Sequence, residues 1–292
     1  MKTQNASRLT CLIAVIITLV STPSCQKTVT DPTAAAGKSA VSVYLTDDPS
    51  LVFEKVWLDI RSVEVKVEDS GEAEAERGHE SEADDNDRHG ITAGGWMSIT
   101  IHPGVYDILR FRNGLDTLFT SGTFSANRQL KKIRVTLGQN NSVVFNGIQR
   151  PLTVKNNDNI IVMQIDESAV QVNSGGMTNI WLDIDAGNSI RKVGNAFELK
   201  PSVKVFSRDK AGTIEGSMLP AGALAVVMAV NGSDTATAKP ASEGEFKFIG
   251  LKKGTYTLVY HATANGYLDQ TVPGIQVGLK EDVHIPTIVL HP

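Results

Sequence analysis

Four aspartates form the only carboxylate grouping in this sequence that a β pattern can bring together. Asp47 and Asp48 end the first apolar alternation, and Asp183 and Asp185 share one face of a later one. If those strand ends are neighbours, the four side chains can bind a polar ligand or, as a minor alternative, serve a hydrolase as acid and base. Capping of a turn explains Asp47 and Asp48 without any ligand.

The established catalytic motifs are absent from the sequence. It has no G-x-S-x-G elbow, H-E-x-x-H, Cys-x-x-Cys or phosphate-binding glycine loop. Its six histidines are scattered, and no nucleophile lies at a recognisable spacing from a base. We therefore expect a protein that is not an enzyme, with no cofactor and no metal.

A carbohydrate-binding protein needs exposed aromatic side chains on which a sugar can stack. Trp96, Trp181 and Tyr267 are the candidates that the pattern leaves. Packing in a β core is the competing role for each of them. Tyr256 and Tyr260 lie on the apolar face of a strand pattern, which predicts that both are buried.

The first residues have the character of an export signal. Lys2 and Arg8 precede an apolar stretch at residues 9–20, which is too short to span a bilayer as a helix. Cys25 follows, ahead of a polar tether, and this arrangement resembles the lipobox of bacterial lipoproteins. We expect a signal peptide at residues 1–24, lipidation of Cys25 and a flexible tether at residues 25–38. The alternative is an ordinary cleaved signal with an incidental cysteine.

Export with a lipid anchor implies a membrane partner, and the number of cysteines excludes an intramolecular disulfide in the mature protein. Cys11 lies within the signal, so cleavage before Cys25 leaves one thiol. The expected location is outside the cytoplasm, anchored to the outer membrane on its periplasmic or surface face. A formal net charge of -4 argues against a nucleic-acid partner.

Residues 68–90 are acidic and low in complexity, with ten carboxylates and no large apolar side chain. Such a segment cannot bury enough surface to offset the entropy of ordering, so we predict a disordered insertion between strands. His79 and His89 within it raise a metal hypothesis. A specific calcium loop needs ligands and a glycine at fixed spacing, which this segment lacks, and a solvated loop is the simpler interpretation.

The remaining chain predicts an all-β protein of two β-sandwich domains, at residues 39–207 and 211–292. Short strand patterns alternate with Asn, Gly and Pro clusters, including a turn at Asn113-Gly114, and no long amphipathic helix is found. A change of apolar phase at Arg61-Ser62 predicts a bulge. Residues 243–260 read as a hairpin around Gly250 and Gly254. Gly244, Gly250 and Gly254 are expected to adopt turn conformations with positive φ. Segments 105–111 and 170–172 are also expected to be strands.

Two families resemble these regions. Motifs at residues 43–49, 56–67, 106–109, 133–138, 182–186 and 199–201 resemble a domain of unknown function of bacterial lipoproteins, DUF4382, which has no assigned activity. Motifs at residues 212–216, 223–230, 243–258, 265–267 and 288–290 resemble the carboxypeptidase regulatory-like family. That resemblance implies a transthyretin-like sandwich of about seven strands, grouped with carbohydrate-binding-like folds and not catalytic.

These observations together predict a non-catalytic, lipid-anchored cell-envelope protein with a binding or structural display role. The alternative is a carbohydrate-binding lipoprotein that takes part in glycan capture. Ligand binding is expected at Asp47, Asp48, Asp183, Asp185, Trp96 and Tyr267. A glycan or an envelope protein is the expected partner besides the membrane.

Overall fold

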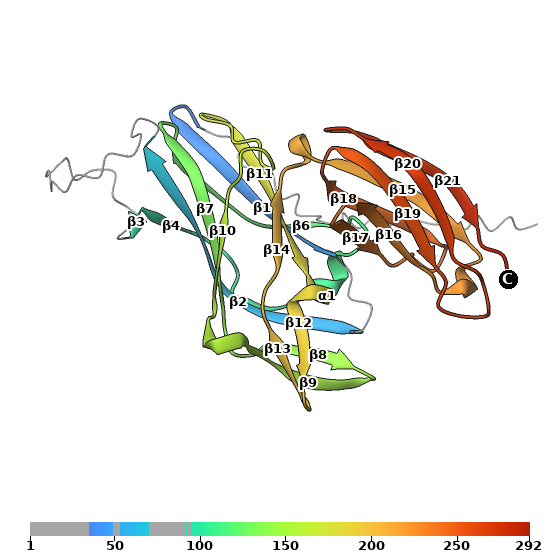
Figure 1. The fold of residues 1–292 in the computed structure, drawn as a ribbon. Helices are drawn as coiled ribbons and strands as arrows, with labels where there is room; N and C mark the ends of the chain where they lie inside the picture. Colours follow the sequence, from blue (N-terminus) through green and yellow to red (C-terminus); the bar gives the residue numbers. More distant parts are fainter. Residues whose placement is uncertain (1–34, 49–52, 70–90, 93–94) are drawn as a thin grey trace, which may run out of the picture. The chain divides into compact units, whose positions relative to one another are not determined.

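The chain folds almost entirely into β-strands, as the sequence predicts (Figure 1). The computed structural model describes residues 35–48, 53–69, 91–92 and 95–292. Residues Asp31–Pro292 belong to one compact unit. Among the described residues, no helix is both long and apolar enough to cross a membrane. Cys25, the signal peptide and most of the acidic insertion lie outside the described residues, so those predictions are untested.

The first part of the chain forms two sheets. Their strands are β1 (Lys38–Asp48), β2 (Lys55–Asp69), β3 (Ile91–Thr92), β4 (Trp96–Ile99), β5 (Gly104–Asp107), β6 (Thr117–Ser125), β7 (Arg128–Leu137), β8 (Ser142–Phe145), β9 (Ile148–Val154), β10 (Ile160–Gln164), β11 (Met177–Asp185), β12 (Ile190–Val193), β13 (Ala196–Leu199) and β14 (Val203–Phe206). Short helices join them at η1 (Ile108–Phe111), η2 (Lys155–Asn157) and α1 (Ala186–Ser189).

One of these sheets has the order β14-β11-β1-β6, and β1 pairs with β11 in parallel. The other runs β10-β7-β2-β8-β9-β13-β12, with β3, β4 and β5 beside it. A single apolar cluster, extending in sequence from Val41 to Leu199, fills the space between them. Sandwich packing buries one face of each sheet, which is why the apolar alternation in the sequence locates this core.

The predicted bulge in β2 is confirmed. Pairing of β2 with β7 shifts register between Ile60 and Ser62, at the phase change in the sequence. Ile60 and Val63 are both fully buried, although their separation of three residues would put them on opposite faces of a regular strand. The extra residue at Arg61 returns the apolar side chains to the core.

The last part of the chain forms two further sheets with a separate core. Its seven strands are β15 (Gly212–Leu219), β16 (Val226–Asn231), β17 (Asp234–Ala238), β18 (Glu245–Leu251), β19 (Gly254–His261), β20 (Gln270–Val277) and β21 (Asp282–Val289), with η3 (Arg208–Lys210) and η4 (Ala221–Ala223). Their orders are β18-β15-β21 and β17-β16-β19-β20. The core lies between Ile214 and Leu290 in sequence.

The hairpin prediction for residues 243–260 is wrong. β18 pairs with β15 in one sheet and β19 pairs with β16 and β20 in the other, so the intervening turn crosses between layers. Phe246 and Phe248 of β18 and Tyr256 and Tyr260 of β19 all point into the shared core. Phe246 meets Tyr260 edge-on, with ring centroids 5.8 Å apart. Alternation predicts which face is buried, but does not decide whether two successive strands pair or stack.

Other strand assignments also differ. Only residues 105–107 of the 105–111 segment are extended, as part of β5, and η1 follows. Residues 170–172 are not a strand, because the amide of Gln171 donates to the Ser207 hydroxyl at 2.9 Å instead of joining a ladder. Strands β6 and β17 were not predicted, since their threonine- and serine-rich sequences lack a strong apolar alternation.

Glycine occupies the positions around β18 for two different physical reasons. Gly244 and Gly250 adopt positive φ, 88° and 75°, as predicted for turn glycines. Gly254 was predicted to do the same and has no positive φ, so that prediction is wrong. A Cβ at Gly254 would instead overlap the side-chain amide of Asn231.

Replacing Gly244 with alanine should destabilise the protein well beyond the cost of its backbone angle. The added Cβ would collide with the carbonyl oxygen of Met218, which cannot move without breaking the ladder. Gly266→Ala is the matched control, because Gly266 has φ 72° and no atom near its missing Cβ. We expect about 1 kcal/mol for Gly266→Ala and about 3 kcal/mol for Gly244→Ala in urea unfolding. Equal losses would contradict the steric argument.

Tyr260→Phe should leave stability at neutral pH within about 1 kcal/mol of the wild type. The Tyr260 hydroxyl is buried and has no hydrogen-bond partner among the described residues, and burial raises its pKa to about 12. Because the unfolded tyrosine ionises near pH 10, the wild type should lose stability as the pH rises from about 10 to about 12. Chemical denaturation across that range should show a smaller loss for the phenylalanine variant. Parallel curves would refute the buried-hydroxyl explanation.

Candidate functional site

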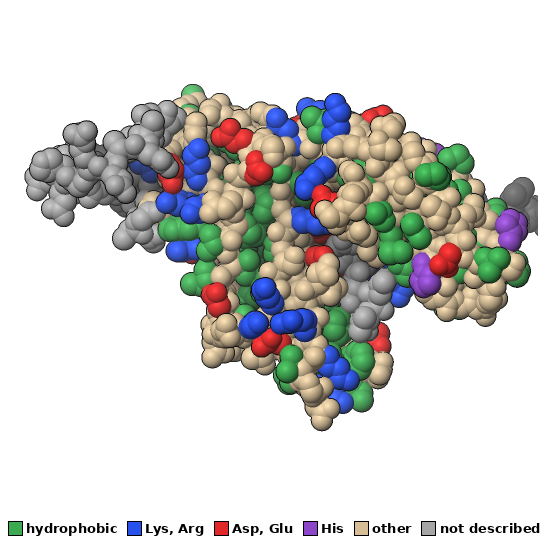
Figure 2. Space-filling model, viewed as in Figure 1, with side chains coloured by type: hydrophobic (Ala, Val, Ile, Leu, Met, Phe, Trp, Pro, Cys, Tyr) green, Lys and Arg blue, Asp and Glu red, His purple; other side chains and the backbone are tan. Residues whose placement is uncertain are grey.

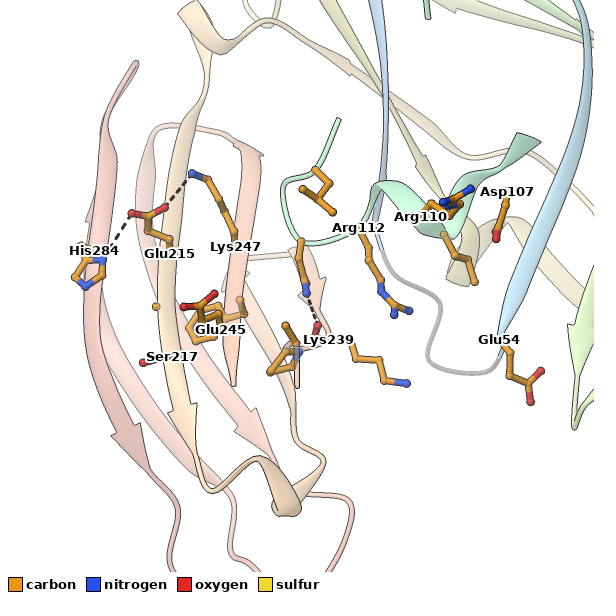
Figure 3. A pocket seen from close by; sticks show the side chains of 17 residues that line it. Glu54, Asp107, Arg110, Arg112, Glu215, Ser217, Lys239, Glu245, Lys247 and His284 are labelled. Atoms are coloured by element: carbon orange, nitrogen blue, oxygen red, sulfur yellow. Dashed lines mark hydrogen bonds and ion pairs between the residues drawn. The ribbon is translucent and has the colours of Figure 1, made fainter. Parts of the chain in front are cut away.

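The candidate site is a groove of about 810 Å³, here named the charged groove (Figure 3). It lies between the face of β15, β18 and β21 and the segment that contains η1. Its lining comprises Glu54, Asp107, Leu109, Arg110, Arg112, Asn113, Leu115, Glu215, Gly216, Ser217, Lys239, Pro240, Ala241, Glu245, Phe246, Lys247 and His284. The volume is within the usual range for small-molecule sites, about 300–1,000 Å³.

A row of three charged or titratable side chains crosses the sheet side of the groove. Glu215 is opposite Lys247 on β18 and His284 on β21 in the strand register. Its carboxylate accepts from Lys247 Nζ at 2.9 Å, and His284 Nδ1 lies 3.7 Å away. The hydrogen bond from Lys247 is the main reason that the pKa of Glu215 is held below its ordinary value, and His284 adds to it. This row is charge-compensated, so it offers little attraction to a further ion.

The opposite side of the groove depends on the turn after η1. The predicted Asn113-Gly114 turn is confirmed, with φ of 58° and 71°. Asn113 Nδ2 donates to the backbone carbonyl of Lys239 at 2.6 Å, which joins the turn to the segment that follows β17. A Cβ on Gly114 would lie 2.8 Å from Lys247 Cγ, so only glycine allows this close approach. The turn thereby places Arg112 and Lys239 on the same groove.

Three basic side chains of the groove, Arg110, Arg112 and Lys239, have no carboxylate partner among the described residues. Figure 3 shows Arg112 and Lys239 pointing into the space between β18, which carries Glu245, and Glu54, the residue before β2. A guanidinium and an ammonium aimed into one groove can bind a carboxylate, sulfate or phosphate through charge-assisted hydrogen bonds. This side of the groove therefore suits an anionic group, while Glu54, Asp107 and Glu245 line the same groove.

The predicted aspartates lie on neighbouring strands but not in this groove. In the parallel pairing of β1 with β11, Asp48 is opposite Asp185, and Asp47 is one position from Asp183. Asp185 caps α1, accepting from the Asn188 amide at 2.8 Å. The side chain of Asp48 lies outside the described residues.

Asp47 and Asp183 are buried, and both line a small cavity together with Lys204 and Thr237. Its volume of about 40 Å³ is far below the roughly 300–1,000 Å³ of small-molecule sites, so the cavity is too small for a sugar. The role of these aspartates in binding stays a prediction.

The predicted aromatic platforms are dispersed. Trp96 on β4 is half-buried beneath the guanidinium of Arg134, 4.3 Å from its ring centroid, and Arg134 pairs with Glu64. Tyr267 packs against the core of the last seven strands. Trp181 is 7% exposed and stacks on Tyr44. None of these rings lines the charged groove.

Sequence reasoning missed the basic residues of the groove. Arg112 and Lys239 are 127 positions apart, and neither belongs to a motif. The only clue was the Asn113-Gly114 turn, which predicted local geometry and no function. Among the described residues, no group of His, Cys, Asp and Glu could hold a metal ion. The metal hypothesis for His79 and His89 concerns residues outside that part of the chain.

Glu215→Gln should reduce the acid sensitivity of the protein. Because the pKa of Glu215 is lowered in the folded state, its contribution is complete above the unfolded value of about 4.5 and is lost as the pH falls through the folded pKa. Both groups of the Glu215–Lys247 pair are more than a third exposed, so the effect at pH 7 should be small. Thermal melts from pH 7 to pH 3 should converge for variant and wild type at the acidic end. A constant difference would contradict this assignment.

Comparison with known proteins gives one family. Residues 38–201 match the family described as "Domain of unknown function (DUF4382)". No curated protein matches the chain.

Similar solved structures include a cohesin–X-dockerin complex from Acetivibrio cellulolyticus, with 23% identity over 27% of this chain and a TM-score of 0.23. This chain covers 56% of that one. The shaft pilin SpaA of Lactobacillus rhamnosus GG is 8% identical over 88% of this chain and 99% of its own, with a TM-score of 0.23. The major pilin subunit BcpA of Bacillus cereus is 11% identical over 87% of this chain and 70% of its own, with a TM-score of 0.24.

Proposed function

The chain belongs to that family of domains of unknown function, and we propose that it is a non-catalytic, lipid-anchored cell-envelope protein with a binding or display role. The observation that carries the binding role is the charged groove. Arg110, Arg112 and Lys239 are held at its edge by a short helix, a tight turn and a strand end, with no carboxylate partner among the described residues. Cations placed in this way favour the binding of an anionic ligand.

The ligand class that we propose is an acidic glycan. This narrows the alternative of a carbohydrate-binding lipoprotein to sugars that carry acidic groups. Neutral sugars are held mainly by stacking on aromatic rings, and the only aromatic residue of the groove, Phe246, is buried. Sugars with carboxylates or sulfates can be held through Arg112 and Lys239 instead. Glu215, Glu245 and Ser217 on the facing sheet supply acceptors for sugar hydroxyls.

The anchor that we propose is the lipidated Cys25, and the last seven strands are proposed to form a carboxypeptidase regulatory-like module. Two observations support the second proposal. Its strands pair only with one another, and they form the seven-stranded two-sheet arrangement that this family implies. The domain boundary is proposed at residues 207–211, between β14 and β15.

Arg112→Ala and Lys239→Ala should each weaken binding of a uronate-containing, sulfated oligosaccharide by about tenfold or more. Each change removes one charge-assisted hydrogen bond from the groove. Calorimetric titration of the mature protein measures the affinity, and a glycan array locates the preferred acid. Lys200→Ala is the control, because Lys200 is exposed and lies outside the groove. Absence of binding to every acidic glycan would refute the glycan assignment, and equal affinity of all variants would refute the groove.

Cys25→Ala should release the protein from membranes while leaving its fold unchanged. Lipidation of this cysteine after signal cleavage is the only anchor that we propose. Fractionation of cells that express wild type and variant, together with metabolic labelling by a fatty acid, measures the change. A variant that still sediments with membranes would contradict the anchor.

A further inference from the structure

We infer that the protein has a second binding surface, which takes an extended acidic peptide along the free edge of β10. The surface is the β10–β14 seam, defined by Ile160–Gln164 of β10 and Val203–Phe206 of β14. These are the terminal strands of the two sheets of the first sandwich, and they do not pair with each other. Both line a groove of about 900 Å³, separate from the charged groove.

The register shows which backbone groups of β10 are free. Leu137 donates to the Asn159 carbonyl and Ile165 donates to the Lys131 carbonyl, each at 2.8 Å. Hydrogen bonding alternates along an antiparallel pair, so the odd-numbered residues of β10 face β7. The N–H and C=O groups of Ile160, Val162 and Gln164 therefore point away from the sheet. Nothing in the described part of the chain pairs with them.

The same reasoning applies to β14. Asp185 donates to the Ser202 carbonyl at 3.0 Å, so Ser202 and Lys204 face β11 and the backbone groups of Val203 and Val205 face outward. At the end of the strand, the outward amide of Ser207 is bonded to the Ala169 carbonyl. Two unpaired edges thus border one groove.

Apart from Gln164 and Lys204, the side chains at the seam are apolar, and several of them are accessible. Ile160 is 49% exposed and Val162 is 50% exposed on β10. Figure 2 shows an apolar stripe between the backbones of β10 and β14. Soluble proteins usually protect a free edge with charges, proline or a bulge, because an accessible apolar edge pairs with other strands. None of these protections is found within β10, and an extended peptide that adds as a further strand satisfies both features.

The charge of the groove selects an acidic peptide. Its lining has four lysines, Lys204, Lys210, Lys252 and Lys253, and two carboxylates, Asp166 and Asp234. Lys252 is neutralised by Asp234 at 2.8 Å. Lys210 and Lys253 have no carboxylate partner among the described residues. A strand with apolar residues on one face and Asp or Glu on the other complements the stripe and these lysines together.

The test uses a nine-residue peptide of alternating valine and glutamate, labelled with a fluorophore, and the mature protein. We expect saturable binding by anisotropy, weakened by added salt. A peptide with lysine in place of glutamate should bind at least tenfold less tightly. Amide exchange at Ile160, Val162 and Gln164 should slow in the complex, while exchange at Ile161 and Met163, already bonded to β7, should change little.

Val162→Pro removes one outward donor without breaking the β7 ladder, and its ring obstructs the edge. We expect at least a tenfold loss of peptide affinity, whereas Val162→Thr, which keeps the amide, should bind within about threefold of wild type. Lys253→Glu should weaken binding without changing stability, which keeps the test valid if the proline variant is unstable. The proposal is overturned if the acidic peptide does not bind, or if protection appears elsewhere. Self-association of the chain through β10 in sedimentation, in place of peptide binding, would overturn it as well.

Discussion

The aromatic stack around Trp181 is the contact on which the arrangement of the charged groove depends. Trp181 lies 4.5 Å from Tyr44, with ring planes 8° apart, and 6.1 Å from Phe206. Its indole nitrogen donates to Asp116 at 2.6 Å, and Arg208 pairs with the same carboxylate. Ile249 of β18 packs against this cluster. The stack therefore fixes β18, which carries Lys247 two residues before Ile249, against β1, β11 and β14.

Charge compensation then differs between the two sides of the groove, and this difference gives it a chemical preference. On the sheet side, Glu215 pairs with Lys247 and has His284 beside it in strand register, and Glu245 lies on the same side. The turn side presents Arg112 and Lys239, whose backbone positions are fixed by the hydrogen bond from Asn113. Fixing the backbone on this side lowers the entropy that binding must overcome. Both features favour recognition of an anion.

The sequence predicted burial better than pairing. The phase change at Arg61 located the bulge in β2, and the alternation around Tyr260 located the second core. Neither pattern could show that β18 and β19 belong to different sheets, because a strand buried on one face reads the same in a hairpin and across a sandwich. A grouping of the aspartates was expected only if the strands of Asp47 and Asp183 were neighbours. The parallel pairing of β1 with β11 makes them neighbours.

The groove itself was beyond sequence reasoning for a different reason. Its cations come from segments that only tertiary packing unites, and a lone arginine or lysine in a loop is indistinguishable from a solvated one. The free edge of β10 was also beyond prediction. Alternation shows that Ile160 and Val162 share a face, but it does not show that β10 is the last strand of its sheet.

The charged groove is proposed to bind an acidic ligand through Arg110, Arg112 and Lys239. Nuclear magnetic resonance of isotope-labelled mature protein, titrated with a sulfated, uronate-containing tetrasaccharide, tests it most directly. Saturable shifts are expected for the Arg112 guanidinium and for the backbone amides of Asn113 and Ala241, with the Trp181 indole unchanged. Shifts that avoid the groove, or no shifts at millimolar oligosaccharide, would contradict it.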